Sequence, residues 1–155
     1  MKQQQTPWFL RGNWAPTQQQ HTSSELTVEG NIPPELNGLY VRTGPNPASG
    51  TGDHWFLGDG MVHGIRLQNG KAEWYRNRFV QTPDITEPLT DPMGGIGDLR
   101  RGKGNTHVMA HNKKILCLEE AHWPWAIDGE LNTIGCENFD DALPCSCLLY
   151  TSPSP

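Results

Sequence analysis

The chain has 155 residues, of which 35% are hydrophobic and 19% charged, and its formal net charge at pH 7 is −5. This composition is typical of a globular protein, and an acidic chain without a basic patch is not expected to bind nucleic acid. Residues Met1–Gln5 do not begin an apolar segment, and no apolar run approaches the roughly 20 residues of a membrane-spanning helix. We therefore expect no signal peptide, no transmembrane segment and a cytoplasmic location.

Residues 1–24 are rich in Gln, Thr and Pro and contain the aromatic residues Trp8, Phe9 and Trp14. This composition predicts an extended arm with aromatic anchors rather than a folded unit. From Leu26 onward the chain consists of short apolar or alternating runs separated by Gly, Pro and Asn, with no helical periodicity, so we expect an all-β fold. These runs are residues 26–28, 39–41, 61–68, 72–80, 107–110 and 115–118.

The Asn69-Gly70 pair predicts a two-residue hairpin turn, because both central positions of such a turn need positive φ. A regular hairpin around this turn would place one apolar and one charged face on its two sides. The predicted pairs are Gln68 with Lys71, Leu67 with Ala72, Arg66 with Glu73, and Ile65 with Trp74. A second, looser hairpin is predicted at residues 111–113, joining residues 106–110 to residues 114–118.

Two features suggest ligand sites but are better explained as structural. The stretch Gly58–Met61 contains two glycines, but neither a Gly-Lys-Ser/Thr motif nor a helix follows, so we expect a tight turn with glycines at positive φ rather than a phosphate loop. The four cysteines, at positions 117, 136, 145 and 147, lack the spacing of a zinc site.

Three motifs in sequence order form the most specific signal in the chain. They are GLYVRTGPNP at residues 38–47, HWFLGDGMVHG at 54–64 and YRNRFVQT at 75–82. Together they resemble the opening of the carotenoid cleavage dioxygenase family, and the resemblance continues through Gly104–Val108 to about Pro144. It implies a seven-bladed β-propeller, of which 155 residues can supply only a first portion. We therefore expect an amino-terminal fragment, with the arm at 1–24 and the first one to two blades at 25–144.

Family resemblance also implies an activity. Members are non-haem Fe(II) dioxygenases that use dioxygen to cleave a C=C bond of carotenoid, apocarotenoid or stilbene-like substrates into two carbonyl products, and one branch isomerises retinyl esters instead. The implied partners are thus an apolar alkene and dioxygen, and a peripheral membrane contact stays open. The alternative is a non-catalytic propeller that binds an apolar ligand or a protein partner. The four downstream histidines of the family would distinguish the two.

The resemblance assigns one candidate site residue, Glu120. The family holds its iron with four histidines, and an acidic residue near this position hydrogen-bonds the outward nitrogen of an iron-bound imidazole. Such a carboxylate fixes the ring's tautomer and raises its basicity without occupying a coordination position. We choose Glu120 over Glu119, and a solvated glutamate at a strand end is the alternative.

No metal ligand is assigned among the six histidines, at positions 21, 54, 63, 107, 111 and 122. His107 and His111 would share one face of a helix, but the alternation around Val108 places them on or near a strand and a loop. The first iron ligand of the family normally lies in an Ala-His-Pro motif, which this sequence lacks. We therefore expect the fragment itself to bind no iron and to be inactive.

The segment at residues 145–155, CSCLLYTSPSP, departs from the family pattern. We expect a non-native tail, such as translated vector sequence, with a genuine short isoform as the alternative. If the tail is non-native, Cys145 and Cys147 should be exposed and reactive, and the prolines should prevent regular structure.

Overall fold

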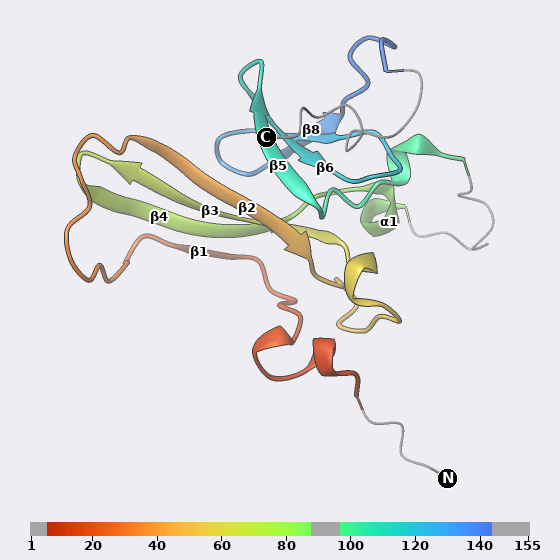
Figure 1. The fold of residues 1–155 in the computed structure, drawn as a ribbon, viewed down its shortest axis with the longest axis horizontal. Helices are drawn as coiled ribbons and strands as arrows, with labels where there is room; N and C mark the ends of the chain where they lie inside the picture. The colour runs from red at the N-terminus through yellow and green to blue at the C-terminus, as the bar shows by residue number, and fades with distance from the viewer. Residues whose placement is uncertain (1–5, 88–96, 144–155) are drawn as a thin grey trace.

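The described residues form two four-stranded antiparallel sheets, so the expected all-β fold is confirmed (Figure 1). The computed structural model describes residues 6–87 and 97–143. The first sheet has the order β1-β4-β3-β2, with β1 His21–Ser23, β2 Gly38–Pro45, β3 Gly60–Gln68 and β4 Lys71–Phe79. The second has the order β5-β6-β7-β8, with β5 His107–His111, β6 Lys114–Leu118, β7 Trp125–Ile127 and β8 Thr133–Cys136.

The helical elements of the described residues are single turns outside the strands. They are α1 at Pro83–Thr86 and the 3-10 turns η1 Trp8–Leu10, η2 Gly12–Trp14, η3 Trp55–Leu57 and η4 Leu99–Arg101. No helix within residues 6–87 or 97–143 has the length and apolar character needed to cross a membrane. The predicted tail at 145–155, with Cys145 and Cys147, lies outside the described residues.

The predicted turn between β3 and β4 is confirmed. Asn69 and Gly70 have φ values of 50° and 75°, and the pairs Gln68 with Lys71 and Leu67 with Ala72 form as expected. Beyond these pairs the predicted register is wrong. Arg66 pairs with Trp74 and Ile65 with Tyr75, so Glu73 is an extra residue in a β-bulge. Turn chemistry fixes only the pairs beside the turn, and a bulge further along shifts every later pair by one.

The second predicted hairpin is also present, joining β5 to β6. Its turn is formed by Asn112 and Lys113, with φ values of 45° and 64°, and His111 pairs with Lys114 at its base. His111 therefore lies in the strand rather than in the turn. The two histidines of β5 thus lie at opposite ends of one strand, which confirms that they do not share a helix face, but neither lies in a loop as expected.

The arm contributes a strand to the first sheet. Residues 21–23 form β1 and pair with β4, so that the sheet's outer strand comes from upstream of the other three. The backbone N–H of His21 donates to Oδ1 of Asn77 over 2.5 Å. Further upstream, the Trp55 ring lies edge-on to those of Trp8 and Trp14, with ring centroids 4.9 and 5.3 Å apart. The aromatic residues of the arm thus contact η3, as anchors would.

The main core lies where the two sheets meet. Val62 of β3 and Val80, directly after β4, pack with Cys117 of β6, Ile127 of β7 and Leu131 in the connection between β7 and β8. Strand β6 is buried on both faces, because Leu116 and Leu118 pack on the side opposite Cys117. The edge strands β2 and β5 lie next to each other at this junction. The residues that follow β2 and precede β5 therefore meet in one place.

Candidate functional site

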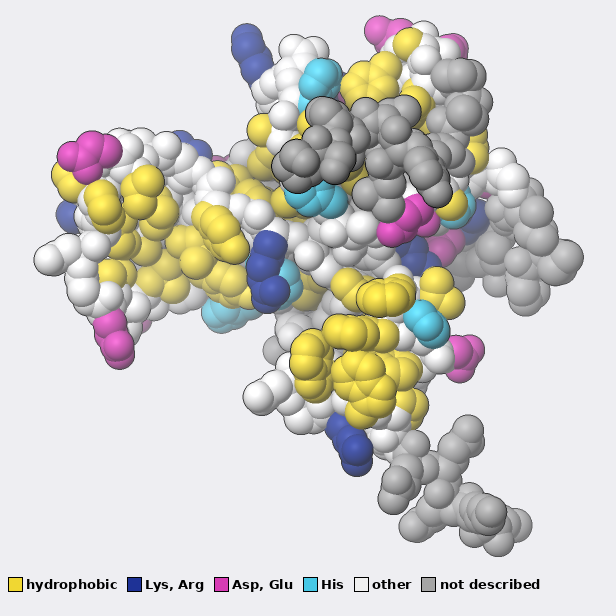
Figure 2. All heavy atoms as spheres, in the orientation of Figure 1, with side chains coloured by type: hydrophobic (Ala, Val, Ile, Leu, Met, Phe, Trp, Pro, Cys, Tyr) yellow, Lys and Arg dark blue, Asp and Glu magenta, His cyan; other side chains and the backbone are white. Residues whose placement is uncertain are grey.

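A cavity of about 530 Å³ opens at this meeting point. Its lining comes from the end of β2, from η3 and from the residues that flank β5 and β6. The lining residues are Thr43, Gly44, Pro45, His54, Phe56, Leu57, Asn105, Thr106 and Glu120. Apolar surface predominates, and Phe56 and Leu57 are each 65% exposed. Figure 2 shows hydrophobic side chains gathered on this face over η3 and the turns of the arm.

Glu120 reaches the cavity because of the β5–β6 hairpin. The backbone N–H of Thr106 donates to the carbonyl of Leu118 over 3.0 Å, which extends the hairpin beyond the last strand pair. Thr106 and Glu120 are thereby brought to the same end of the hairpin, and the Thr106 hydroxyl lies 3.2 Å from Oε2 of Glu120. The carboxylate is exposed to the cavity and has no hydrogen-bonding partner other than Thr106 among the described residues.

Glu119 has different surroundings. Its Oε2 lies 2.5 Å from Nδ1 of His122, and its side chain is 17% exposed. It is not among the residues that line the cavity. The two adjacent glutamates are therefore separated by the structure: Glu119 is held by a neighbouring imidazole, whereas Glu120 presents a carboxylate to open space.

Asn105 is a site residue that sequence reasoning missed. Only 6% of this residue is exposed, and its Nδ2 donates to the backbone carbonyls of Phe56 and Gly58 over 2.9 and 2.7 Å. The available signal was the polar Gly104-Asn105-Thr106 stretch directly before an apolar strand. That stretch belongs to the segment that carried the family resemblance, but nothing in it indicated which carbonyls the amide would bind.

The described histidines do not converge on a metal position. In residues 6–87 and 97–143, no three His, Cys, Asp or Glu side chains form a group that could hold a metal ion. Nδ1 of His54 accepts from the backbone N–H of Phe56 over 3.2 Å and so caps η3. His63 lies 2.8 Å from the Tyr75 hydroxyl, and burial, helped by the charge of Arg42, lowers the pKa of His63.

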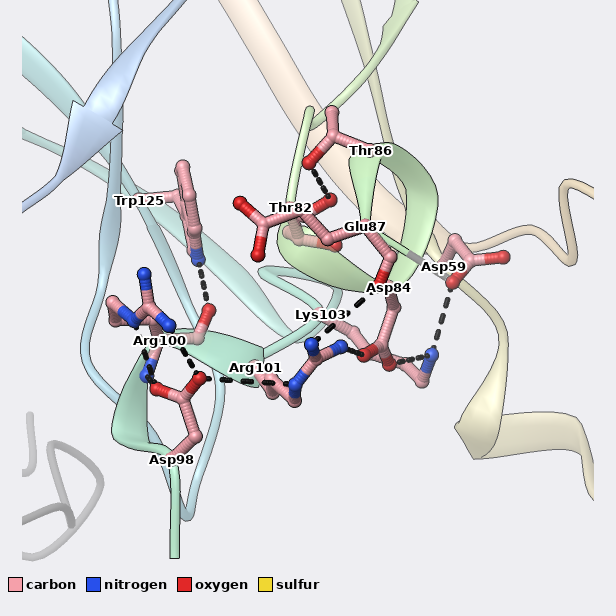
Figure 3. A network of polar contacts seen from close by, with 10 residues as sticks. All are labelled: Asp59, Thr82, Asp84, Thr86, Glu87, Asp98, Arg100, Arg101, Lys103 and Trp125. Carbon is pink, nitrogen blue, oxygen red and sulfur yellow. Dashed lines mark hydrogen bonds and ion pairs between the residues drawn. The ribbon is translucent and has the colours of Figure 1, made fainter. Parts of the chain in front are cut away.

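A network of charges fixes the segment that leads into the site (Figure 3). Nζ of Lys103 donates to Asp59 and Asp84 over 2.9 Å each, and Arg101 donates to Asp84 over 3.0 Å. Burial alone would raise the pKa of Asp84, but the hydrogen bonds and charges of Lys103 and Arg101 outweigh burial and hold it below its ordinary value. Burial would likewise lower the pKa of Lys103, and its two carboxylate partners raise it instead. The network joins the loop before β3 to α1 and to the residues before β5.

The glycines in this loop are required because a side chain there would not fit. The prediction of positive φ at Gly58 is wrong: its φ is −69°, and Gly60 begins β3 without a positive φ. A Cβ atom at Gly58 would lie 2.8 Å from the backbone nitrogen of Asn46, closer than real side chains approach. The loop therefore packs directly against the end of β2, and this contact holds η3 beside the cavity.

Comparison with known proteins identifies the family. A family model described as "Retinal pigment epithelial membrane protein" matches residues 14–152, most of the chain. The carotenoid cleavage oxygenase of Mycobacterium tuberculosis is 41% identical over 143 residues, which are 87% of this chain and 28% of that protein. The chain belongs to the carotenoid cleavage oxygenase family. The resemblance carried by the three sequence motifs is thereby confirmed.

Other members extend the comparison. Resveratrol cleavage oxygenase 1 of Aspergillus fumigatus is 33% identical over 144 residues, covering 83% of this chain and 28% of that protein. The crystal structure of the lignostilbene dioxygenase of Pseudomonas brassicacearum superposes with a TM-score of 0.77 at 28% identity, covering 92% of this chain and 34% of that one. The chain thus spans about a third of the length of these carotenoid cleavage oxygenase relatives. The family match extends into residues 145–155, whose origin stays a prediction.

Proposed function

We propose that this chain is the amino-terminal part of an Fe(II)-dependent dioxygenase that cleaves a C=C bond of an apolar alkene to two carbonyl products. The named substrates of its relatives, carotenoids, resveratrol and lignostilbene, suggest a conjugated alkene with aromatic or polyene character. The apolar cavity wall formed by Phe56 and Leu57 suits such a substrate. Isomerisation of a related apolar ester stays an alternative for the same site.

In this proposal the two sheets are the first two blades of a seven-bladed propeller. Each is a four-stranded antiparallel sheet, and their first hairpin-connected strands, β2 and β5, lie next to each other. Blades arranged around a common axis bring their innermost strands together in this way. The remaining blades, and the four histidines expected on the iron, would come from sequence beyond this chain.

Glu120 is the residue we propose to act on the iron site. Its carboxylate lines the cavity and, among the described residues, accepts one hydrogen bond, from Thr106, which leaves it able to accept another from an imidazole N–H. The bound iron supplies dioxygen activation in this chemistry. The carboxylate of Glu120 accepts a hydrogen bond from the outward N–H of an iron-binding histidine. This bond fixes the orientation of the ring and keeps its other nitrogen available to the metal.

The decisive observation is the different placement of the two glutamates, and the test uses it. In the complete enzyme, Glu120→Gln should lower Fe(II) affinity or activity by roughly 10–100-fold, because an amide is a weaker acceptor than a carboxylate. Glu119→Gln is the matched control and should leave Fe(II) affinity near that of the wild type. Fe(II) affinity is measured by anaerobic chelator competition and turnover by aldehyde formation. Wild-type values in Glu120→Gln would remove Glu120 from the site.

A second candidate is a non-catalytic propeller that binds an apolar ligand or a protein partner. The large exposed fractions of Phe56 and Leu57 are compatible with it. Sequencing the complete gene distinguishes the two functions, because a non-catalytic relative need not retain the four histidines. Binding of a stilbene by the metal-free complete protein, without turnover when Fe(II) is added, would favour this candidate.

A further inference from the structure

The side chain of Asn105 connects two parts of the cavity that are distant in sequence. Nδ2 donates to the carbonyls of Phe56 and Gly58, which lie within η3 and directly after it. These two carbonyl acceptors establish which amide atom is the nitrogen. The amide oxygen, Oδ1, therefore faces the Thr106 hydroxyl, at 3.2 Å. One buried amide thus reaches both the apolar wall and the polar side of the cavity.

The Thr106 hydroxyl in turn reaches the carboxylate. Its oxygen lies 3.2 Å from Oδ1 of Asn105 and 3.2 Å from Oε2 of Glu120. A threonine hydroxyl carries one proton, and in the described part of the chain these two oxygens are its acceptors. The hydroxyl therefore donates to one of them at a time or divides its proton between them, so the Asn105 amide competes with Glu120 for the proton and affects how strongly the hydroxyl binds the carboxylate.

Burial makes this arrangement stiff. With 6% of Asn105 exposed, the amide has almost no water to replace a lost partner, and a buried donor without an acceptor is costly. The carbonyls of Phe56 and Gly58 would lose their partner along with it. A change at Asn105 should consequently be transmitted in two directions, to η3 and to Glu120.

We propose that Asn105 is a positioning residue that fixes two sides of the cavity at once, the apolar wall of Phe56 and Leu57 and, through Thr106, the carboxylate of Glu120. The role in orienting Glu120 rests on the proposed function of that residue. The proposal predicts that loss of Asn105 changes both substrate affinity and iron affinity. A change at one of its neighbours should alter only one of these two affinities.

Variants of the complete enzyme at three positions test this prediction. Asn105→Ala should lower Fe(II) affinity by roughly 10–100-fold and raise KM for a stilbene substrate as well. Thr106→Val should lower Fe(II) affinity while KM stays near the wild-type value, and Thr106→Ser, which retains the hydroxyl, should restore that affinity. Leu57→Ala should raise KM by roughly 10-fold without changing Fe(II) affinity. The absorption spectrum of the Co(II)-loaded protein should change in Asn105→Ala and Thr106→Val but not in Leu57→Ala.

Asn37, an exposed asparagine at the opposite end of β2, provides a control for the loss of amide contacts away from the cavity. Its Nδ2 donates to the carbonyl of Pro34 over 2.9 Å, and its Oδ1 accepts from the backbone N–H of Asn69 over 2.8 Å. Asn37→Ala removes the same kinds of contact without touching the cavity, so its Fe(II) affinity and KM should be those of the wild type.

The outcomes separate the positioning role from the proposed function. Values for Asn105→Ala that equal those of Asn37→Ala would overturn the positioning role. If Asn105→Ala does not fold, wild-type Fe(II) affinity in Thr106→Val would overturn it instead. Failure of the unmodified complete protein to bind Fe(II) and turn over an alkene would contradict the proposed function itself.

Discussion

At the scale of single residues, Gly70 is a position where backbone conformation and space both limit the side chain. Its φ is 75°, and a Cβ atom there would lie 3.2 Å from the carbonyl oxygen of Ile32. A β-branched residue is strained at positive φ, and here it would also press on a neighbouring strand connection. The turn between β3 and β4 therefore depends on glycine for two independent reasons.

We predict that Gly70→Val lowers the free energy of unfolding of the complete protein by about 1–3 kcal/mol. Chemical denaturation measures this difference, provided that the slope of unfolding free energy against denaturant concentration is the same in the variant and the wild type. Gly129→Val is the control, because Gly129 has no positive φ and a Cβ atom there would meet nothing within 4 Å. A stability unchanged in Gly70→Val would mean that the turn does not constrain the hairpin.

At the scale of elements, the ion network around Lys103 holds together connections rather than strands. It links the loop before β3, helix α1 and the turn η4 through Asp59, Asp84 and Arg101. The side chain of Lys103 is 26% exposed, so water screens its charge only in part. Loss of the lysine would leave the carboxylates of Asp59 and Asp84 close together without the cation between them.

We predict that Lys103→Met costs about 1–3 kcal/mol in free energy of unfolding, because two charge-assisted hydrogen bonds are lost. Lys71→Met, at an exposed position, should cost less than about 0.5 kcal/mol. A cost at Lys103 no larger than that at Lys71 would show that the network does not stabilise the fold.

The pH dependence of the network has a defined sign. The pKa of Asp84 is lowered in the folded protein, so its contribution to stability is present above the ordinary carboxyl pKa of about 4 and is lost as pH falls through the folded value. The pKa of Lys103 is raised, so its contribution is present below about pH 10 and is lost as pH rises further. Stability in Asp84→Asn should accordingly fall less steeply in acid than in the wild type, as thermal unfolding between about pH 2 and pH 5 would show.

The elements also show what could be predicted from the sequence. The Asn69-Gly70 turn and the strand pairs beside it follow from local chemistry, and so they were predicted correctly. The bulge at Glu73 was not, because the register beyond a turn depends on packing against the second sheet, where Trp74 contacts the core. Likewise Glu120 was assigned by resemblance, but the bonds of Asn105 to Phe56 and Gly58 join segments nearly fifty residues apart and leave no local pattern.

At the scale of the whole molecule, the described sheets leave surfaces that further chain would cover in the proposed propeller. Strand β8 is an edge of the second sheet, and Ile134 within it is 56% exposed. Tyr40 on β2, an edge of the first sheet, is 61% exposed. Exposed edges with apolar side chains are templates for pairing with other chains.

We predict that the polypeptide of residues 1–155 alone self-associates, binds no Fe(II) tightly and has no dioxygenase activity. The proposed iron site needs imidazoles from several blades, and one portion of a propeller cannot assemble them. Analytical ultracentrifugation, anaerobic Fe(II) titration and an aldehyde assay under air would test the three parts. Stoichiometric Fe(II) binding together with aldehyde formation from a stilbene would contradict the prediction.

The upstream origin of β1 determines when the first sheet can be completed during protein synthesis. His21 pairs with Asn77, so β1 leaves the ribosome well before its partner strand exists. At about 5–20 residues per second, the intervening chain takes on the order of 3–10 s to make. For the first part of this time Trp8 and Trp14 also lack Trp55, their partner in η3, and until its end β1 lacks β4. The nascent arm should therefore be a substrate for chaperones that bind exposed aromatic segments.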